Sequence, residues 1–434
     1  MYLADSRSTG SRGTEAAVVP DTRPGRRPAA VPSTVLALGA VSLITDVSSE
    51  MVTAVLPLYV VAGLGLSPLG FGLLDGINNG VGALVRLAGG HLADRGGRRH
   101  KVVAGLGYGL SALCKPLLLL AHTLPVLGAV LAVDRTGKGL RTAPRDAMIS
   151  LATEPAHRGR AFGVHRAMDT TGALLGPLVA FAVLRATVDG YDAVFAVSGC
   201  VALLGVLVLV LFVPGHITPA GVVQPPEQGR PSLRDALGLL RLPELRRLTL
   251  CASVLGLTTV SDSFLYLLLQ RAGNLPAHLF PLLPLGTAAC FLLLAVPLGA
   301  LADRVSRRRL FLAGHGALLL GYGLVLSPWH GLPAVIAVLV LHGTFYAATD
   351  GVLAAATAAV VPARQQGAGQ ALVGTGQALA RFACSLAFGA AWSLWGGRSA
   401  LAVTAAALAV SAVVATFVLR GTDETPTTTD EVPA

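Results

Sequence analysis

Long apolar runs separated by short polar segments follow one another along the chain from residue 35 onward. A helix needs about 20 residues to cross the hydrocarbon core of a bilayer. Twelve segments reach that length. Because they are continuously apolar instead of alternating, they predict helices and not the strands of a membrane barrel. The predicted spans are residues 35–62, 68–93, 101–121, 125–145, 160–186, 192–213, 245–270, 278–302, 309–327, 332–360, 367–395 and 399–420.

Polar segments divide these spans into two groups of six. We therefore expect an all-α integral membrane protein with twelve transmembrane helices in two bundles. The predicted parts are a disordered N-terminal tail (1–32), an N-terminal six-helix bundle (33–213), a proline-rich linker (214–242), a C-terminal six-helix bundle (243–420) and a disordered C-terminal tail (421–434).

The composition supports a membrane protein. The chain has 434 residues, of which 53% are hydrophobic and 13% are charged, whereas a soluble domain carries roughly 25% charged residues. A soluble globule needs more polar surface than this, and a disordered chain needs fewer apolar residues. The net charge of +10 would suggest nucleic acid in a soluble protein. Here the arginines cluster in short loops, which points to lipid headgroups and excludes a nucleic-acid partner.

Basic residues are concentrated in alternate loops. The N-terminal tail and the loops after spans two, four, six, eight and ten hold most of the arginines, and the opposite loops offer little beyond Arg185, Arg271 and Arg398. Loops rich in arginine and lysine stay on the cytoplasmic side. The pattern predicts a multi-pass protein of the bacterial cytoplasmic membrane with both termini in the cytoplasm.

Two pairs of segments repeat at nearly the same spacing. Gly90–Arg99 (GHLADRGGRR) recurs 209 residues later as Gly299–Arg308 (GALADRVSRR), and Pro155–Gly159 (PAHRG) is echoed 207 residues later in Pro362–Gly367 (PARQQG). Two unrelated echoes at one offset indicate two six-helix repeats in parallel orientation.

The Gly90–Arg99 segment resembles the loop 2–3 signature of the major facilitator superfamily of secondary transporters, G-x-L-a-D-r-x-G-r-[KR]. Its weaker copy lies between spans eight and nine, where that family has one. The resemblance covers nearly the whole chain and implies a monomeric transporter that rocks between two orientations. A cytoplasmic gate is then expected from Gly90, Asp94, Arg95, Arg98, Arg99, Asp303, Arg304 and Arg307, joined by Arg145, Asp146, Arg166 and Asp169 near the cytoplasmic ends of spans four and five.

Two further segments resemble family signatures less closely. In span four, Asp134–Arg141 (DRTGKGLR) is similar to the pattern R-x-x-Q-G-x-G, with Lys138 in place of the usual glutamine and Arg141 in place of the last glycine. The family's arginine, here Arg135, is linked to proton coupling. In span five, residues 172–181 (GALLGPLVAF) resemble the antiporter signature G-x-x-x-G-P-x-x-G-G without its final glycines.

Two carboxylates lie near the centre of span one. Asp46 and Glu50 are four residues apart and share one helical face. An ionisable group at membrane depth is costly and marks function or pairing. Like charges so close repel, which favours proton uptake by one of them. We expect Arg135 to neutralise the other and assign proton coupling to Asp46, Glu50 and Arg135. The alternative is a permanent structural ion pair.

Other polar residues at membrane depth are candidates for a substrate cavity. Asn78 and Asn79 could instead hydrogen-bond between helices. The C-terminal half holds fewer charges, so we expect it to supply a more apolar wall, and we expect Asp350 to pair with Arg381. The predicted cavity residues are Asp75, Asn78, Asn79, Lys115, Lys138, Arg141, Asp262, Tyr266 and Arg381.

The sequence favours a transporter over other classes of protein. It contains no nucleophile–base constellation and no nucleotide motif, and its histidines and cysteines lack metal-ligand spacing. We therefore expect no enzyme, cofactor or metal. The leading hypothesis is proton-coupled efflux of a small amphipathic or apolar compound. One alternative is an anionic metabolite bound by Lys115, Lys138 and Arg141. Another is a non-transporting membrane receptor, against which the duplicated gate motif argues.

Overall fold

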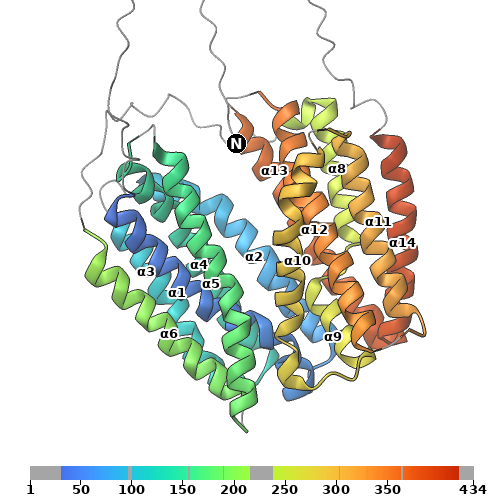
Figure 1. Ribbon diagram of the computed structural model, residues 1–434, viewed down its shortest axis with the longest axis horizontal. Helices are drawn as coiled ribbons and strands as arrows, with labels where there is room; N and C mark the ends of the chain where they lie inside the picture. The colour runs from blue at the N-terminus through green and yellow to red at the C-terminus, as the bar shows by residue number, and fades with distance from the viewer. Residues whose placement is uncertain are drawn as a thin grey trace, which may run out of the picture.

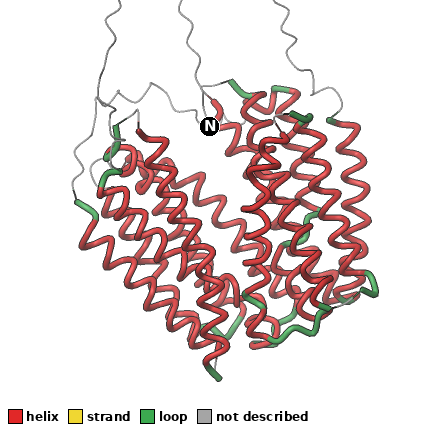
Figure 2. Tube along the Cα trace, in the orientation of Figure 1, coloured by secondary structure: helices red, strands yellow, loops and turns green. Residues whose placement is uncertain are grey.

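The computed structural model describes residues 31–95, 100–154, 157–188, 190–215, 238–302, 304–329, 331–362 and 365–419. In these ranges the chain consists of long helices joined by short loops, without a strand (Figure 2). The first six spans are α1 (Ser33–Leu58) with a π-helical turn η1 (Tyr59–Gly63), α2 (Pro68–Arg95), α3 (His100–Leu117) with η2 (Leu118–Leu120), α4 (Leu124–Leu151), α5 (Arg158–Ala186) and α6 (Gly190–Phe212).

The second six spans follow the linker. They are α8 (Pro243–Leu257) and α9 (Asp262–Ala272), α10 (Leu282–Ala302), α11 (Arg307–Leu326), α12 (Leu332–Val360), α13 (Gln366–Trp395) and α14 (Gly397–Val418), with short 3-10 turns at η4 (Leu239–Arg241) and η5 (Ala277–Leu279). The predicted all-α membrane fold with twelve spans is confirmed. In the described part of the chain, ten helical segments are long and apolar enough by themselves to cross a membrane. The other two spans, α2 and α4, are 28 residues long each.

The helices form two bundles with the same neighbours in each (Figure 1). In the first bundle α3 packs on α4 and α6, and α2 packs on α4. In the second, α11 packs on α12 and α14, and α10 packs on α12. Leucines on the outer faces, such as Leu207 and Leu211 of α6, stay exposed because their solvent is lipid. This matching of neighbours is the structural counterpart of the sequence repeat.

Corresponding helix ends of the two bundles lie at the same end of the protein. The first residue of α1, the last residue of α6 and the last residue of α14 lie at one end of the protein, which we name the tail side (Figure 1). Successive spans alternate in direction, so the Arg95 end of α2 and the Ala302 end of α10 also face the tail side. The two copies of the gate motif therefore begin on one side, as parallel repeats require.

The bundles meet through α2 and α13, away from the tail side (Figure 1). Glycines allow this close approach, because a Cβ atom at Gly389 would lie 2.6 Å from the carbonyl oxygen of Pro68. The backbone N–H of Leu69 donates to Ser393 Oγ at 3.1 Å. Toward the tail side the two bundles diverge (Figure 1).

Span seven is interrupted at residues 258–261, whereas the sequence pattern predicts one helix over 245–270. The interruption comprises Thr258, Thr259, Val260 and Ser261, and its β-branched residues disfavour helix. The hydroxyls of both threonines donate to the carbonyl of Leu255 at 3.0 and 2.8 Å. These bonds occupy a carbonyl of the last turn of α8. The freed N–H of Val260 donates to Tyr322 Oη at 2.9 Å, which satisfies it inside the bundle.

Candidate functional site: a central cavity and its charge network

A cavity of about 350 Å³ lies between the two bundles. Its walls come from α1 and α2 of the first bundle and from α10, α12, α13 and the interrupted span of the second. Such a volume is within the range of small-molecule sites. Seven of the residues singled out from the sequence line it, namely Glu50, Asp75, Asn78, Asp262, Tyr266, Asp350 and Arg381.

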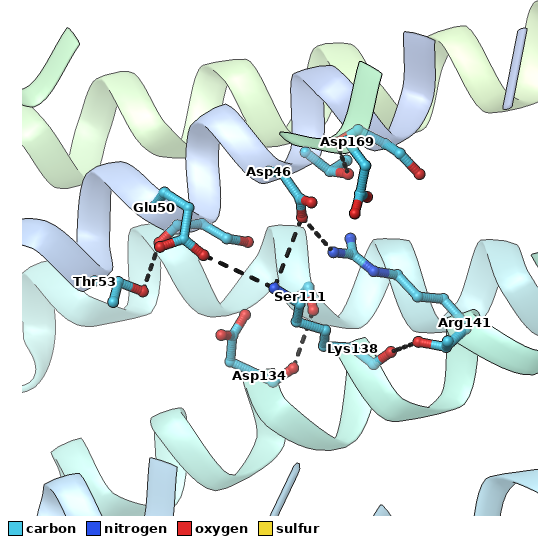
Figure 3. Close-up of polar contacts among 12 residues, drawn as sticks. Asp46, Glu50, Thr53, Ser111, Asp134, Lys138, Arg141 and Asp169 are labelled. Atoms are coloured by element: carbon cyan, nitrogen blue, oxygen red, sulfur yellow. Dashed lines mark hydrogen bonds and ion pairs between the residues drawn. The ribbon is translucent and has the colours of Figure 1, made fainter. Parts of the chain in front are cut away.

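Asp46 and Glu50 both face the ammonium group of Lys138 (Figure 3). Lys138 Nζ lies 3.8 Å from Asp46 Oδ1 and 3.9 Å from Glu50 Oε1. Asp46 is buried and also accepts from Arg141 Nη2 at 3.2 Å, and the guanidinium of Arg141 stacks on the ring of Tyr108. Lys138, with 37% of its side chain exposed, is thus shared by two acids of which one already holds another cation.

Glycines bring these helices together. A Cβ atom at Gly176 of α5 would lie 2.6 Å from Cβ of Glu50 and 2.8 Å from the carbonyl oxygen of Val47. A Cβ atom at Gly107 of α3 would lie 2.7 Å from the carbonyl oxygen of Gly137 and 2.9 Å from the nitrogen of Arg141. Gly176, in the segment that resembles the antiporter signature, therefore lets α5 approach α1, and Gly107 lets α3 approach α4, which helps to position the charges on α1 and α4.

Arg135 does not neutralise Asp46 or Glu50, which is the role that the sequence predicted for it. Its guanidinium lies 3.5 Å from Asp134 Oδ2, and the cations that neutralise Asp46 and Glu50 are Arg141 and Lys138. The reason is the helical register of α4, which places residues 138 and 141 on the face toward Asp46 and Glu50. Lys115, expected in the cavity, is instead buried inside the first bundle, where its Nζ binds Asp134 Oδ1 at 2.9 Å.

A second layer of charges lies next to Asp46, nearer the tail side. Arg145 contacts Asp146 at 3.0 Å and Asp169 at 3.7 Å, and Arg166 reaches the other oxygen of Asp169 at 3.9 Å. The carboxylates of Asp169 and Asp46 lie close together in Figure 3. The structure thus brings together the four predicted gate residues of spans four and five, in contact with the surroundings of the proposed proton site.

The copy of the gate motif in the second bundle is described only in part. Arg304 is exposed, and Arg307 Nη1 donates to the carbonyl of Ala355 on α12 at 3.4 Å. Gly90 lies within α2, but the surroundings of Gly90 and the side chains of Asn79, Asp94 and Arg95 are not described, and Arg98, Arg99 and Asp303 lie outside the described residues.

Asp75 of α2 forms a hydrogen bond with a residue of the other bundle. Its carboxylate accepts from Ser385 Oγ of α13 at 2.7 Å, within the contact between α2 and α13. Asp75 is buried, so this bond satisfies a polar group at the seam of the two bundles.

The second bundle supplies a polar wall and not the apolar one expected from its sparse charges. Asp262 begins α9 and accepts from His342 Nε2 at 3.0 Å and from Tyr346 Oη at 2.7 Å, both of α12. The ring of Tyr346 in turn lies under the guanidinium of Arg381, 5.8 Å from its centroid. The wall is polar because the interrupted span places Thr259, Ser261, Asp262 and Ser263 on the cavity in succession.

Several contributing residues were missed from the sequence. Ser42 joins His165 and Tyr108 near the Asp46 cluster, at 3.0 and 3.4 Å. His342 carried a usable signal, because it precedes Tyr346 by four residues and therefore shares its helical face. Ser385 carried none, since its partner Asp75 belongs to the other bundle.

A second cavity of about 280 Å³ lies within the second bundle. It is lined by parts of α8, α11, α12 and α13, and it shares Thr259, Asp350 and Arg381 with the cavity between the bundles. In the described part of the chain no ion pair joins Asp350 to Arg381, in contrast to the expectation from the sequence.

Comparison with known proteins places these features among transporters. The Major Facilitator Superfamily matches residues 38–290 and 264–434. An uncharacterized MFS-type transporter of Methanocaldococcus jannaschii is 29% identical over 71% of this chain and 76% of its own. Multidrug resistance protein MdtH of Photorhabdus laumondii is 29% identical over 38% of this chain and 40% of its own. The crystal structure of nucleoside transporter NupG superimposes with a TM-score of 0.77 at 13% identity, over 89% of this chain and 99% of NupG.

Proposed function

The chain belongs to the Major Facilitator Superfamily and is a secondary transporter of the membrane, and on that basis we propose that it exports a small amphipathic compound in exchange for protons. The proposal includes a bacterial cytoplasmic membrane as its location and cytoplasmic termini, which follow from the arginine-rich loops. The tail side is then the cytoplasmic side.

One observation carries the proton coupling, namely the sharing of Lys138 between Asp46 and Glu50 at 3.8 and 3.9 Å. Two acids and one exposed ammonium group form an arrangement whose charge balance changes when either acid takes up a proton. Protonation of Glu50 leaves Lys138 to Asp46 alone, and deprotonation draws it back toward the cavity. The position of a cation beside the cavity therefore depends on proton occupancy.

The proposed direction of exchange, export, is consistent with the arrangement of the bundles. They touch through α2 and α13 away from the tail side and diverge toward it (Figure 1). In this state a compound from the cytoplasm can reach the cavity. Rocking of the bundles would then open the opposite side, where protons enter and reset the carrier. Substrate and proton favour opposite orientations, and this competition produces exchange.

The cavity wall suits an amphipathic compound. Tyr266, Phe280 and Phe291 offer aromatic surface, while Glu50 and Asp262 line the same cavity. The similarity to a multidrug resistance protein is consistent with export, although it covers less than half of either chain.

The alternative of an anionic metabolite bound by the cations of spans three and four has less support. Lys115 is bound to Asp134 and Arg141 to Asp46, at 2.9 and 3.2 Å. Only Lys138 of the three retains appreciable exposure, and it faces two carboxylates. An anion at this place would have to displace acids that are part of the helix next to it.

Proteoliposomes with an imposed proton gradient test the proposal. The probe is an amphipathic fluorescent dye, ethidium, added to the side that the cytoplasm would occupy. The combined substitution Asp46→Asn and Glu50→Gln should abolish uphill accumulation, while downhill equilibration of the dye continues. Asp192→Asn, an acid-to-amide change at the exposed start of α6, is the matched control and should accumulate dye as the natural chain does. Uphill accumulation that survives the double substitution would overturn the assignment of the proton site.

A further inference from the structure

Three residues line both cavities, and two of them are charged. Thr259 comes from the interruption of span seven, Asp350 from α12 and Arg381 from α13. The two cavities therefore meet at a junction that carries one negative and one positive group. This junction is separate from the Asp46 and Glu50 cluster of the first bundle.

The other acids of the cavity wall already have partners. Glu50 faces Lys138 at 3.9 Å. Asp75 accepts from Ser385 at 2.7 Å. Asp262 accepts from both His342 and Tyr346. The histidine of the second cavity, His315, is engaged by the carbonyl of Phe311 at 2.9 Å.

Asp350 and Arg381 differ from these residues. In the described chain neither of them takes part in an ion pair, although both lie at membrane depth, where charges are normally paired. Arg381 stacks its guanidinium over Tyr346, which orients the side chain, while Asp262 and Asp350 act on its charge from beyond the distance of an ion pair. A ligand that carries both signs of charge would neutralise both residues at once, whereas an ion of either sign would leave one of them unmatched.

The remainder of the larger cavity is suited to the body of such a ligand. Tyr266, Phe280 and Phe291 lie on its wall together with Pro284. A flat apolar group of moderate size fits the volume of about 350 Å³.

We infer that the transported compound is a small amphipathic zwitterion, whose carboxylate binds Arg381, whose ammonium group binds Asp350 and whose apolar body lies against the aromatic wall. Arginine suits a carboxylate because its planar fork donates two parallel hydrogen bonds. The inference rests on the proposed function only in that it takes the cavity between the bundles as the transport site.

Three probes with one aromatic body separate the possibilities, namely phenylalanine (both charges), phenethylamine (cation) and phenylpropanoate (anion). Their dissociation constants are measured on the purified full chain in detergent, without any gradient. The natural chain should bind phenylalanine about tenfold or more tightly than either singly charged probe, because each ionic hydrogen bond is worth that much.

Two substitutions then identify the partner of each charge. Arg381→Gln should remove the advantage of phenylalanine over phenethylamine, and Asp350→Asn should remove its advantage over phenylpropanoate. The melting temperature of each variant without ligand shows that it is folded. For a variant that does not fold, Arg381→Lys or Asp350→Glu replaces it and should reduce the same advantage while keeping its sign.

The inference is overturned if phenylalanine binds no better than the singly charged probes, if none of the three binds at millimolar concentration, or if each substitution weakens all three probes alike. The last result would mean that Asp350 and Arg381 neutralise each other at longer range. These measurements use no proton gradient, so they are independent of the coupling test. Uphill accumulation that survives in the Asp46 and Glu50 double variant, with an intact zwitterion preference, would overturn the proton site alone.

Discussion

The two bundles repeat the same helix packing but neutralise their charges in opposite ways. In the first bundle, buried charges of opposite sign are bound directly to each other, as Lys115 is to Asp134 and Arg141 is to Asp46. In the second, the partly exposed acid Asp262 accepts hydrogen bonds from a phenol and an imidazole, and no ion pair joins Asp350 to Arg381 in the described residues.

This difference suggests a division of labour between the repeats. Ion pairs between helices fix the helices and respond to protons, because each carboxylate that gains a proton releases a cation. A hydrogen bond from a phenol, such as that of Tyr346 to Asp262, holds an acid in place without using up a lysine or an arginine. Charges in the second bundle thereby stay available to a ligand. Substitutions that remove one partner at a time test whether the two bundles differ in this way.

The largest effect is expected from Asp134→Asn. Asp134 is the acid that faces both Lys115 and Arg135, and the side chains of Asp134 and Lys115 are 5% and 2% exposed. Its removal leaves two cations uncompensated inside the bundle, which should lower the free energy of unfolding by about 3–5 kcal/mol. Equilibrium unfolding of the purified protein in mixed micelles measures this change.

Asp146→Asn provides the matched control for that substitution. It makes the same chemical change on the same helix, but the Asp146 side chain is 44% exposed. Its pair with Arg145 should contribute less than about 1 kcal/mol. Equal losses in the two variants would contradict the view that buried ion pairs fix the first bundle.

An intermediate effect is expected from Tyr346→Phe in the second bundle. The substitution removes the hydroxyl that donates to Asp262 at 2.7 Å and leaves the ring under Arg381 in place. A hydrogen bond to a charged group is worth about 1.5–3 kcal/mol. Unfolding in mixed micelles should show a loss of that size.

Tyr322→Phe is the companion variant, because its hydroxyl accepts from the neutral N–H of Val260 at 2.9 Å. Its loss should be smaller, about 0.5–1.5 kcal/mol. A larger loss for Tyr322→Phe than for Tyr346→Phe would mean that Asp262 does not depend on the hydrogen bond from Tyr346.

The smallest effect on stability is expected from Glu50→Gln. Glu50 and Lys138 are partly exposed and 3.9 Å apart, so their attraction should contribute less than about 1 kcal/mol. The melting temperature in detergent should therefore hardly change, even though the same substitution weakens gradient-driven accumulation in proteoliposomes. A strongly destabilised Glu50→Gln protein would indicate a structural ion pair, as in the first bundle's interior.

Most of the fold could be predicted from the sequence because the bilayer imposes simple rules. Length and continuous hydrophobicity locate the spans to within a few residues, as for 332–360, which coincides with α12 (Leu332–Val360). The interruption of span seven was not foreseen, because a hydropathy window averages over Thr258–Ser261. The signal was present in the β-branched run followed by Ser261 and Asp262, which are residues typical of a helix start.

The charged residues of the site could be found from the sequence, but their partners could not. Asp46 and Glu50 stand out as acids in an apolar run. Their cations depend on how α4 is rotated against α1, which is set by backbone contacts such as that of Gly107 with Gly137. A contact across the bundles, such as Asp75 with Ser385, joins residues 310 apart in sequence, and no local pattern specifies it.

The glycine-rich contact of α2 with α13 bears on the speed of the transport cycle. At Gly389 the backbone of α13 contacts the backbone of α2 directly. Few side chains interdigitate at this point, so few have to be separated when the helices move apart. Many weak dispersion contacts, each about 0.1–0.2 kcal/mol, can be lost one after another as α2 and α13 separate. We expect this contact to act as a hinge in which the hydrogen bond between Asp75 and Ser385 is the main interaction to be broken, and a bulky residue placed at Gly389 to slow the cycle.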